Sequence, residues 1–421
     1  MKTVSFGSAP LGMDNVAMET ALSPKAMRDL VNFDVSNTGI LECRAGARRL
    51  TTKDKCHSLW SPRSKNFGLF VDDLNLKKLT PIVGGALSTS TVLADLQTND
   101  LMKYYEYAGD VYFTNGKDLG VVTSSGAHRL GIAPALFPPT LDSVTGGLPP
   151  GKYACAFSYI TSAGEESALS PAAFWDVVDG GVLVNLPWGF PDRASAVRVY
   201  ATLTNGDLLY MYQEVPIGTQ SVRVQQLPDG KLTSTQFLSQ MVGGSDVSVY
   251  NGRVYVSRGD VLWASDPFNF GLVDMGSGFV SFGAEILFHE PVVDGIYVGT
   301  AAGVFFLAGG GPKDFKQSLV TTAPVMNDSI SLPGAFMAEL NAEGRPDPNI
   351  GADVAVWLGA HGFVIGYPSG AVKEVQSQHI ALGEQGSGSL AAVAANGIRR
   401  VVSLVETATR RAGGSASDSF I

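Results

Sequence analysis

The sequence predicts an all-β protein: a β-propeller of about six or seven blades with a small β-sandwich inserted into it. Three observations support this class. The 421 residues include 49 glycines and 22 prolines, so turns are frequent. Hairpin patterns recur with turns about 35–60 residues apart, a spacing typical of units that hold several strands. One segment, bounded by proline clusters, breaks this rhythm and has the strand density of a sandwich.

Composition narrows the class further. Apolar residues make up 45% of the chain and charged residues only 16%, which favours a large core and argues against helical bundles and disorder. The net charge is −9, and the sequence shows no sign of the basic face that is typical of nucleic-acid-binding proteins. Transient passage of DNA stays compatible with it, because an acidic surface repels DNA instead of holding it.

The cysteines and the apolar runs indicate the compartment of synthesis. Cys43, Cys56 and Cys155 are odd in number and form no CxxC, so we expect no disulfide framework and synthesis in a reducing cytosol. The first residues lack the apolar stretch of a signal peptide. No apolar run reaches about 18 residues, so no membrane span is expected.

The N-terminal region carries a helix signal and then a hairpin signal. Ser23–Leu30 has a capping serine and an early proline, which favour a turn or two of helix. A second short helix is expected near Ala335–Leu340. In the segment Leu30–Gly46, LVNFDVSNTGILECRAG, two apolar arms flank a turn at Asn37–Gly39. Phe33 and Leu41 are the candidates for one buried face of this strand pair.

Hairpin signals fill most of the remaining chain. Asn-Gly between apolar runs is the strongest short-range hairpin pattern. Four such pairs occur, at Asn115-Gly116, Asn205-Gly206, Asn251-Gly252 and Asn396-Gly397. We assign residues 1–135 and 229–421 to the propeller and residues 136–228 to the inserted sandwich of the fibronectin type III or immunoglobulin class.

Strict alternation defines the insertion. Gly151–Thr161 alternates strictly from Tyr153 to Tyr159, which predicts a strand in the core of the insertion. Further strands are expected at 182–186, 197–202, 208–214 and 222–224. Tyr153, Phe157 and Tyr159 have the spacing of core residues on a strand, although a sugar-binding aromatic platform would give the same pattern.

No catalytic, metal-binding or cofactor-binding residues are assigned. The five histidines, His57, His128, His289, His361 and His379, have no metal-ligand spacing. The stretch Ser265–Gly271 comes nearest to the Asp-box turn of propeller glycosidases, but its spacing differs and Pro267 indicates an ordinary turn. Glycoside hydrolysis needs two convergent carboxylates, and the sequence nominates no pair.

Three stretches resemble a known family. The first is Gly12–Ala17 with Ala26–Val35 and Gly39–Gly46, which follows "G-x-D-N … A-x-R-D-x-x-N-[aliphatic]-D … G-x-[apolar]-x-x-R-x-G" except that Phe33 stands at the aliphatic position. The second stretch is Val261–Pro267, which is similar to a late hairpin of the same proteins. The third is Gly164–Pro171, which is similar to the G-x-E-S-x-x-S turn of fibronectin-like insertions in phage structural proteins. Together they resemble the β-propeller tail hub, nozzle and packaged-DNA-stabilisation proteins of tailed bacteriophages.

The resemblance implies a non-catalytic virion protein, made in the host cytoplasm and placed in the tail or head–tail junction. It implies a ring of copies, commonly six, in contact with the portal or adaptor and other tail proteins, and in transient, sequence-independent contact with genomic DNA. The matched residues are expected to be structural anchors; they are Arg28, Asn32, Asp34, Gly39, Arg44 and Gly46. No cofactor is implied.

Two other functions stay open. One is a receptor- or glycan-binding tail or baseplate adhesin, and the other is a polysaccharide hydrolase. For the virion role, we hypothesise that acidic side chains line the lumen of the ring, so that DNA slides through it. We also expect the N-terminal strands to complete the last blade and close the propeller.

Overall fold

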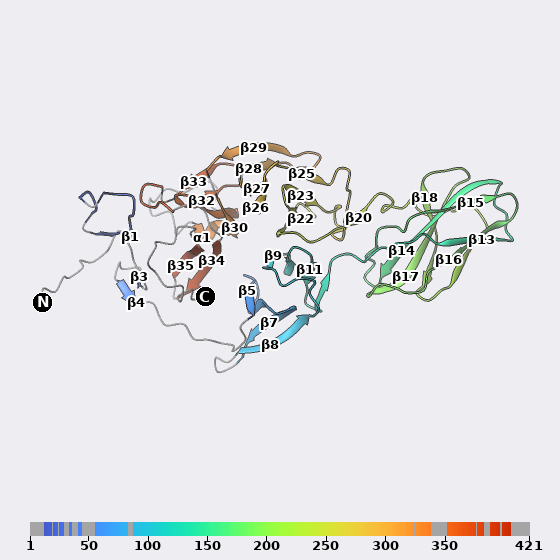
Figure 1. Ribbon diagram of the computed structural model, residues 1–421, viewed down its shortest axis with the longest axis horizontal. Helices are drawn as coiled ribbons and strands as arrows, with labels where there is room; N and C mark the ends of the chain where they lie inside the picture. The colour runs from blue at the N-terminus through green and yellow to red at the C-terminus, as the bar shows by residue number, and fades with distance from the viewer. Residues whose placement is uncertain are drawn as a thin grey trace. The chain divides into compact units, whose positions relative to one another are not determined.

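A computed structural model of the chain describes residues 12–18, 20–23, 25–28, 33–35, 41–43, 55–82, 87–323, 325–337, 352–375, 377–382, 388–395 and 398–405 (Figure 1). The chain divides into two compact units. Unit 1 comprises residues 1–56, 257–261 and 281–421, and unit 2 comprises residues 57–256 and 262–280.

The all-β class is confirmed, because the chain forms many small sheets and, within the described ranges, one helix, α1 (Gly334–Met337). This helix lies where the second of the two short helices was expected. The helix expected at Ser23–Leu30 is wrong. Ala26 and Met27 form strand β2 (Ala26–Met27), which pairs in parallel with β1 (Gly12–Met13). A helix of one or two turns is marginal by itself, so pairing with another segment overrides the local signal.

Three four-stranded sheets belong largely to unit 2, and in each the strands neighbour one another in chain order. The strands of the first are β5 (Cys56–Trp60), β6 (Gly68–Asp72), β7 (Asn75–Pro81) and β8 (Leu87–Leu93). Those of the second are β9 (Lys103–Tyr107), β10 (Asp110–Thr114), β11 (Leu119–Val122) and β12 (Ala127–Arg129). Those of the third are β21 (Asp246–Tyr250), β22 (Arg253–Arg258), β23 (Val261–Ala264) and β25 (Phe279–Ser281).

The turn between β21 and β22 shows how the sequence sets these hairpins. Asn251 and Gly252 both have positive φ, 46° and 72°. A two-residue hairpin turn of this kind requires positive φ at both positions, which explains the preference for Asn-Gly. The hairpin predicted at Asn251-Gly252 is therefore confirmed.

Unit 1 contains two further four-stranded sheets with the same chain-order arrangement. Their strands are β26 (Ile286–Val292), β27 (Gly295–Thr300), β28 (Gly303–Ala308) and β29 (Lys316–Thr321), then β30 (Val325–Leu332), β31 (Val354–Gly359), β32 (Gly362–Gly366) and β33 (Val372–Glu374). The Trp357 ring lies between Phe288 and Tyr297, at centroid distances of 5.6 and 5.3 Å, in the core that the two sheets share.

Burial follows one pattern across these five sheets. Strands in the middle of a sheet, such as β11, β27 and β31, are buried along their whole length. The last strand of each sheet is more exposed: residues 87–91 of β8 and 316–319 of β29 face solvent. Each of the five sheets therefore has buried inner strands and a more exposed last strand.

A two-sheet module, residues 140–224, separates the second and third sheets of unit 2 and is drawn in green in Figure 1. One sheet has the order β13 (Thr140–Val144), β16 (Gly181–Asn185), β19 (Ser221–Val224). The other has the order β15 (Ala173–Val177), β14 (Gly151–Thr161), β17 (Ala194–Thr202), β18 (Leu209–Pro216). Apolar side chains of both sheets form a single core cluster.

The aromatic residues of β14 belong to that core. Tyr153, Phe157 and Tyr159 are at most 4% exposed. The core interpretation is confirmed, and the alternative of a sugar-binding platform on these three residues is wrong. The strand boundaries Gly151–Thr161 agree with the prediction. The wider division into residues 1–135, 136–228 and 229–421 stays a prediction.

The remaining sheets are two-stranded. They include β20 (Ser239–Gln240) with β24 (Leu272–Val273) and β34 (Gly388–Ala395) with β35 (Ile398–Val405). The predicted N-terminal hairpin is present as β3 (Phe33–Val35) and β4 (Leu41–Cys43), with Val35 opposite Leu41 and Phe33 opposite Cys43. The shared buried face expected of Phe33 and Leu41 stays a prediction, and the turn at Asn37–Gly39 lies outside the described residues. None of the helices described could cross a bilayer.

Candidate binding site

The expected anchors fall only partly within the described residues. The Arg28 guanidinium donates a hydrogen bond to the Ala17 carbonyl, within the N-terminal segment. Asp34 lies in β3 opposite Glu42. The other four anchors are outside the described residues; they are Asn32, Gly39, Arg44 and Gly46. The anchoring role of the set stays a prediction.

Two residues beside this set bind a distant part of unit 1. The Asn15 carboxamide donates to the Ala381 carbonyl and accepts from the Ala381 amide, both at 2.8 Å. Asp14 Oδ2 lies 3.1 Å from His379 Nδ1. Backbone donation from Ala17, followed by the contact with His379, lowers the pKa of Asp14. Asp14 and Asn15 stand in the quoted G-x-D-N stretch but were not nominated as anchors.

In unit 2, the quoted Gly164–Pro171 turn is fixed to strand β14. The Ser167 hydroxyl accepts a hydrogen bond from the Tyr159 amide at 3.0 Å, and the Ser170 hydroxyl accepts from the Phe157 amide at 3.1 Å. Serine hydroxyls thus occupy backbone donors that would otherwise be buried without partners. These bonds fix the position of the two glutamates at the start of the turn.

Glu165, the first of these glutamates, joins the two-sheet module to the end of the β9–β12 sheet. Its Oε1 accepts from the Gly131 amide at 2.8 Å, and its Oε2 pairs with the Arg193 guanidinium. Arg193 also donates to the Arg129 carbonyl at 2.8 Å. We call Glu165, Arg193 and the Arg129–Gly131 segment the clamp. It ties two loops of the module to one segment outside it.

Backbone packing reinforces the clamp. A Cβ at Gly131 would lie 2.9 Å from the Gly271 carbonyl oxygen, and a Cβ at Gly271 would lie 2.4 Å from the Gly131 Cα. Gly131 also has a φ of +73°. Only glycine satisfies both the close approach and the backbone conformation at this point.

Glu166 faces the module instead. Its carboxylate pairs with Arg198 at 2.9 Å, accepts from the Ser158 hydroxyl at 2.6 Å and accepts from the Tyr200 hydroxyl. Burial, followed by the bond to Glu166, raises the pKa of Tyr200 to about 12. Both adjacent carboxylates are therefore compensated by an arginine.

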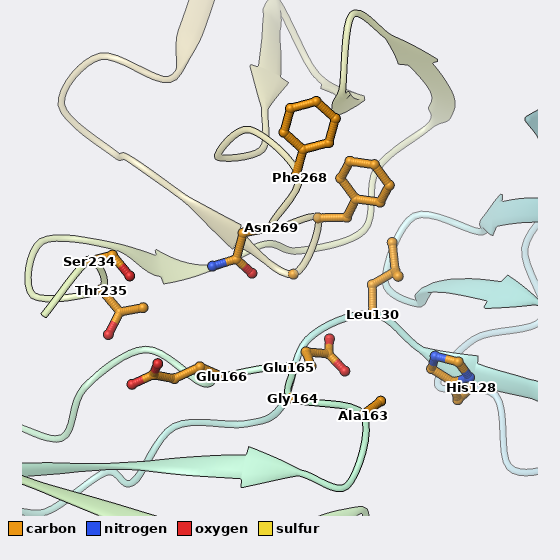
Figure 2. A pocket seen from close by; sticks show the side chains of 12 residues that line it. His128, Leu130, Ala163, Gly164, Glu165, Glu166, Ser234, Thr235, Phe268 and Asn269 are labelled. Atoms are coloured by element: carbon orange, nitrogen blue, oxygen red, sulfur yellow. The ribbon is translucent and has the colours of Figure 1, made fainter. Parts of the chain in front are cut away.

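A cavity of about 470 Å³ opens beside the clamp, entirely within unit 2. Figure 2 shows the module's loop on one side and the turn from Phe268 to Gly271 on the other, with His128 at one end. Its lining residues are His128, Leu130, Ala163, Gly164, Glu165, Glu166, Ser234, Thr235, Phe268, Asn269, Phe270 and Gly271.

The cavity has a mixed but nearly neutral chemistry. Burial, followed by the nearby Arg193 charge, lowers the pKa of His128, which favours the neutral imidazole. With Glu165 and Glu166 paired to arginines, no uncompensated carboxylate faces the space. Across the described part of the chain, no three His, Cys, Asp or Glu residues gather in a metal-binding group.

Sequence reasoning did not identify this site. Ser265–Gly271 was interpreted as an ordinary turn, and it is a turn, closed by an isolated bridge between Asp266 and Asn269. The site depends on which loops meet there, and a local pattern carries no such information. The only available signal was two aromatic residues, Phe268 and Phe270, in a short polar loop.

No protein-family model matches the chain, and no curated protein matches it. Among solved structures, it is similar to the extracellular domain of a hybrid two-component system from B. thetaiotaomicron, at 12% identity and a TM-score of 0.24, covering 86% of this chain and 47% of that one. The chain thus spans about half the length of that relative.

Two further similarities are equally distant. BBS1N in complex with ARL6DN shares 10% identity at a TM-score of 0.30, covering 86% of this chain and 90% of that one. Sqt1 of Saccharomyces cerevisiae shares 10% identity at a TM-score of 0.24, covering 74% and 81%. At these scores the similarities support no conclusion about function.

Proposed function

We propose that this chain is a structural virion protein of a tailed bacteriophage. In this proposal the five four-stranded sheets outside the two-sheet module are blades of a β-propeller, and the module is a fibronectin-like β-sandwich inserted between blades. Copies form a ring in the tail hub, nozzle or head–tail junction that guides or retains packaged DNA. The repeated four-stranded sheet, with buried inner strands and a more exposed last strand, is the observation that carries the proposal.

The burial pattern supports the blade interpretation. In a propeller, the inner strands of each blade pack against neighbouring blades, whereas the outermost strand faces solvent. The five four-stranded sheets outside the two-sheet module have this gradient. The bonds from Asn15 to Ala381 fit the expected closure, because they join the N-terminal segment to the segment that lies between β33 and β34 in the chain.

A ring that passes DNA needs stiffness and a surface that does not hold the duplex. The clamp stiffens the link between the module and the β9–β12 sheet. A net charge of −9 opposes retention of phosphates. Heterologous contacts between identical discs close into a ring when the rotation between neighbours allows it. The role is non-catalytic, with the portal or adaptor and other tail proteins as further partners.

Native mass spectrometry of the purified chain over a wide concentration range tests the ring. We expect one closed stoichiometry to dominate, commonly six. A monomer at every concentration, or an open ladder of oligomers, would contradict the proposal. In particles, replacing acidic residues that line the ring's lumen by lysine should slow genome release, and unchanged ejection kinetics would count against the sliding role.

A further inference from the structure

We propose that the outer edge of strand β8 binds a second copy of this chain. Two β8 strands pair antiparallel about a two-fold axis at Thr89 and join their sheets into one. This pairing goes beyond the virion role and does not depend on it. Three features of β8 support it: its exposure, its lack of the protection that the other last strands have, and its symmetric, uncharged sequence.

Strand β8 is exposed on both of its faces. It is the last strand in the order β5-β6-β7-β8, and no other described strand pairs with its outer edge (Figure 1). Its first five residues, 87–91, are all exposed. Because successive side chains point to opposite faces of a strand, this run leaves both faces in solvent. The backbone donors and acceptors of the outer edge are therefore available to a further strand.

The last strands of the other four-stranded sheets outside the module carry protection that β8 lacks. Short length and charged side chains are common means by which proteins prevent pairing at a sheet edge. Strands β12, β25 and β33 have three residues each, and β29 contains Lys316. Strand β8 has seven residues, none of them charged and none a proline. Of these five last strands, β8 is the one that is both long and uncharged.

The regular part of β8 ends at a bulge. Its pairing with β7 is continuous from Leu87 to Thr91. The register then shifts, so that Val92 has no residue opposite it on β7. A bulge bends the strand and increases its twist. The regular edge that a partner strand can follow is therefore residues 87–91, and its centre is Thr89.

The sequence of this edge suits pairing with itself. The five residues are Leu-Ser-Thr-Ser-Thr, so the serines stand symmetrically about the central threonine. In a contact with two-fold symmetry, the same patch of both copies meets itself. Antiparallel pairing centred on Thr89 places the two Thr89 residues opposite each other and each Ser88 opposite a Ser90. Hydroxyl side chains at opposed positions form favourable cross-strand pairs.

Charge favours a second copy over an acidic or basic partner. The strand itself has no charged residue, so two identical edges bring no like charges together. The two lysines of the neighbouring strand β7 are held within their own sheet. Lys77 pairs with Asp72, and the Lys78 ammonium lies 4.5 Å from the centroid of the Phe67 ring. A strongly charged partner segment would therefore find no opposite charge on β8.

Charges placed at Thr89 test the pairing, with analytical ultracentrifugation of the full chain as the measurement. A pairing of five residues is a small contact, so we expect the wild-type assembly to double its mass at high concentration. Because each Thr89 faces its own copy, Thr89→Lys alone and Thr89→Glu alone should each weaken the doubling about fivefold or more. An equal mixture of the two variants places lysine opposite glutamate and should restore the doubling.

Matched controls are Gln317→Lys and Gln317→Glu, since Gln317 is an exposed residue of another last strand, β29. Neither control should change the doubling, alone or mixed. Thr89 is exposed, so its variants should unfold at the wild-type temperature, and loss of doubling then reflects the contact itself.

Three results would overturn the pairing: a wild-type assembly that never doubles, single Thr89 variants that double as the wild type does, or a mixture that does not recover. The virion proposal fails separately. A single chain that doubles without forming a ring would retain the β8 pairing and remove the ring, whereas a closed ring that never doubles would do the reverse.

Discussion

Asn15 and Ala381 exchange two hydrogen bonds of 2.8 Å, although 366 positions separate them in the sequence. The Asn15 carboxamide thus supplies one donor and one acceptor, and these bond the carbonyl and the amide of the Ala381 backbone. Asp14 adds a contact with His379 from the same turn. These bonds tie the first described residues of unit 1 to its C-terminal part.

Asn15→Ala should release this connection. Two partly solvated hydrogen bonds contribute about 1–2 kcal/mol together. We expect the Ala381 amide to exchange with deuterium faster, because it loses its acceptor. Met18→Ala is the control, since Met18 is 78% exposed in the same segment. Unchanged protection of Ala381 in Asn15→Ala would mean that the contact does not hold the segment.

Gly131→Ala should destabilise unit 2 more than Gly164→Ala. Both glycines have positive φ, but a Cβ at Gly164 meets nothing within 4 Å, whereas one at Gly131 meets the Gly271 backbone. Gly164→Ala should cost about 1–2 kcal/mol, the conformational penalty alone. Gly131→Ala should cost about 1–3 kcal/mol more because backbone must move. Chemical denaturation measures both, and equal losses would refute the close packing.

A double-mutant cycle of Glu165→Gln and Arg193→Ala measures the clamp. The pair is partly exposed, with side-chain exposures of 22% and 31%, so the coupling should be about 0.5–1 kcal/mol. Glu165→Ala, which removes the acceptor of the Gly131 amide, should also increase the exchange of that amide. Arg223→Ala removes an exposed arginine of the same module and should change neither quantity. A coupling energy of zero would mean that the Glu165–Arg193 pair does not stabilise unit 2.

The stability of unit 2 should depend on His128 at mildly acidic pH. The pKa of His128 is lowered in the folded state by burial, with Arg193 opposing the charge and Glu165 and Asp110 favouring it. Above the unfolded pKa of about 6.5 the imidazole is neutral in both states, and its contribution to the free energy of unfolding is complete. As pH falls from about 6.5 through the lower folded pKa, the unfolded state binds the proton more tightly, so the free energy of unfolding decreases. His128→Gln should flatten the loss of unfolding free energy below about pH 6.5; identical pH profiles would disprove the assignment.

Period-two alternation predicted the strands that are buried on at least one side. Gly151–Thr161 was predicted with the observed limits, because its alternating aromatic residues face the module's core. The sequence did not reveal β13 or β15, whose residues are mostly exposed or half-buried, so their apolar signal is weak. At Ser23–Leu30, a cap and a proline indicated a helix, but pairing with Gly12–Met13 prevailed.

The cavity could not be predicted for a different reason. Its walls come from loops more than 100 residues apart, such as Ala163–Glu166 and Phe268–Gly271. Local patterns gave the turn at Ser265–Gly271 but neither the positive φ of Phe268 nor the contact between Gly131 and Gly271. Such features arise from tertiary packing, which a single sequence does not encode in any short motif.

Locating the chain in purified tailed particles by cryo-electron microscopy tests the central proposal most directly. The account predicts a symmetric ring of this chain at the portal-distal end of the head or along the tail axis, with blade-like density around the DNA path. Density for the chain in a peripheral fibre or spike, or its absence from the particles, would contradict the account.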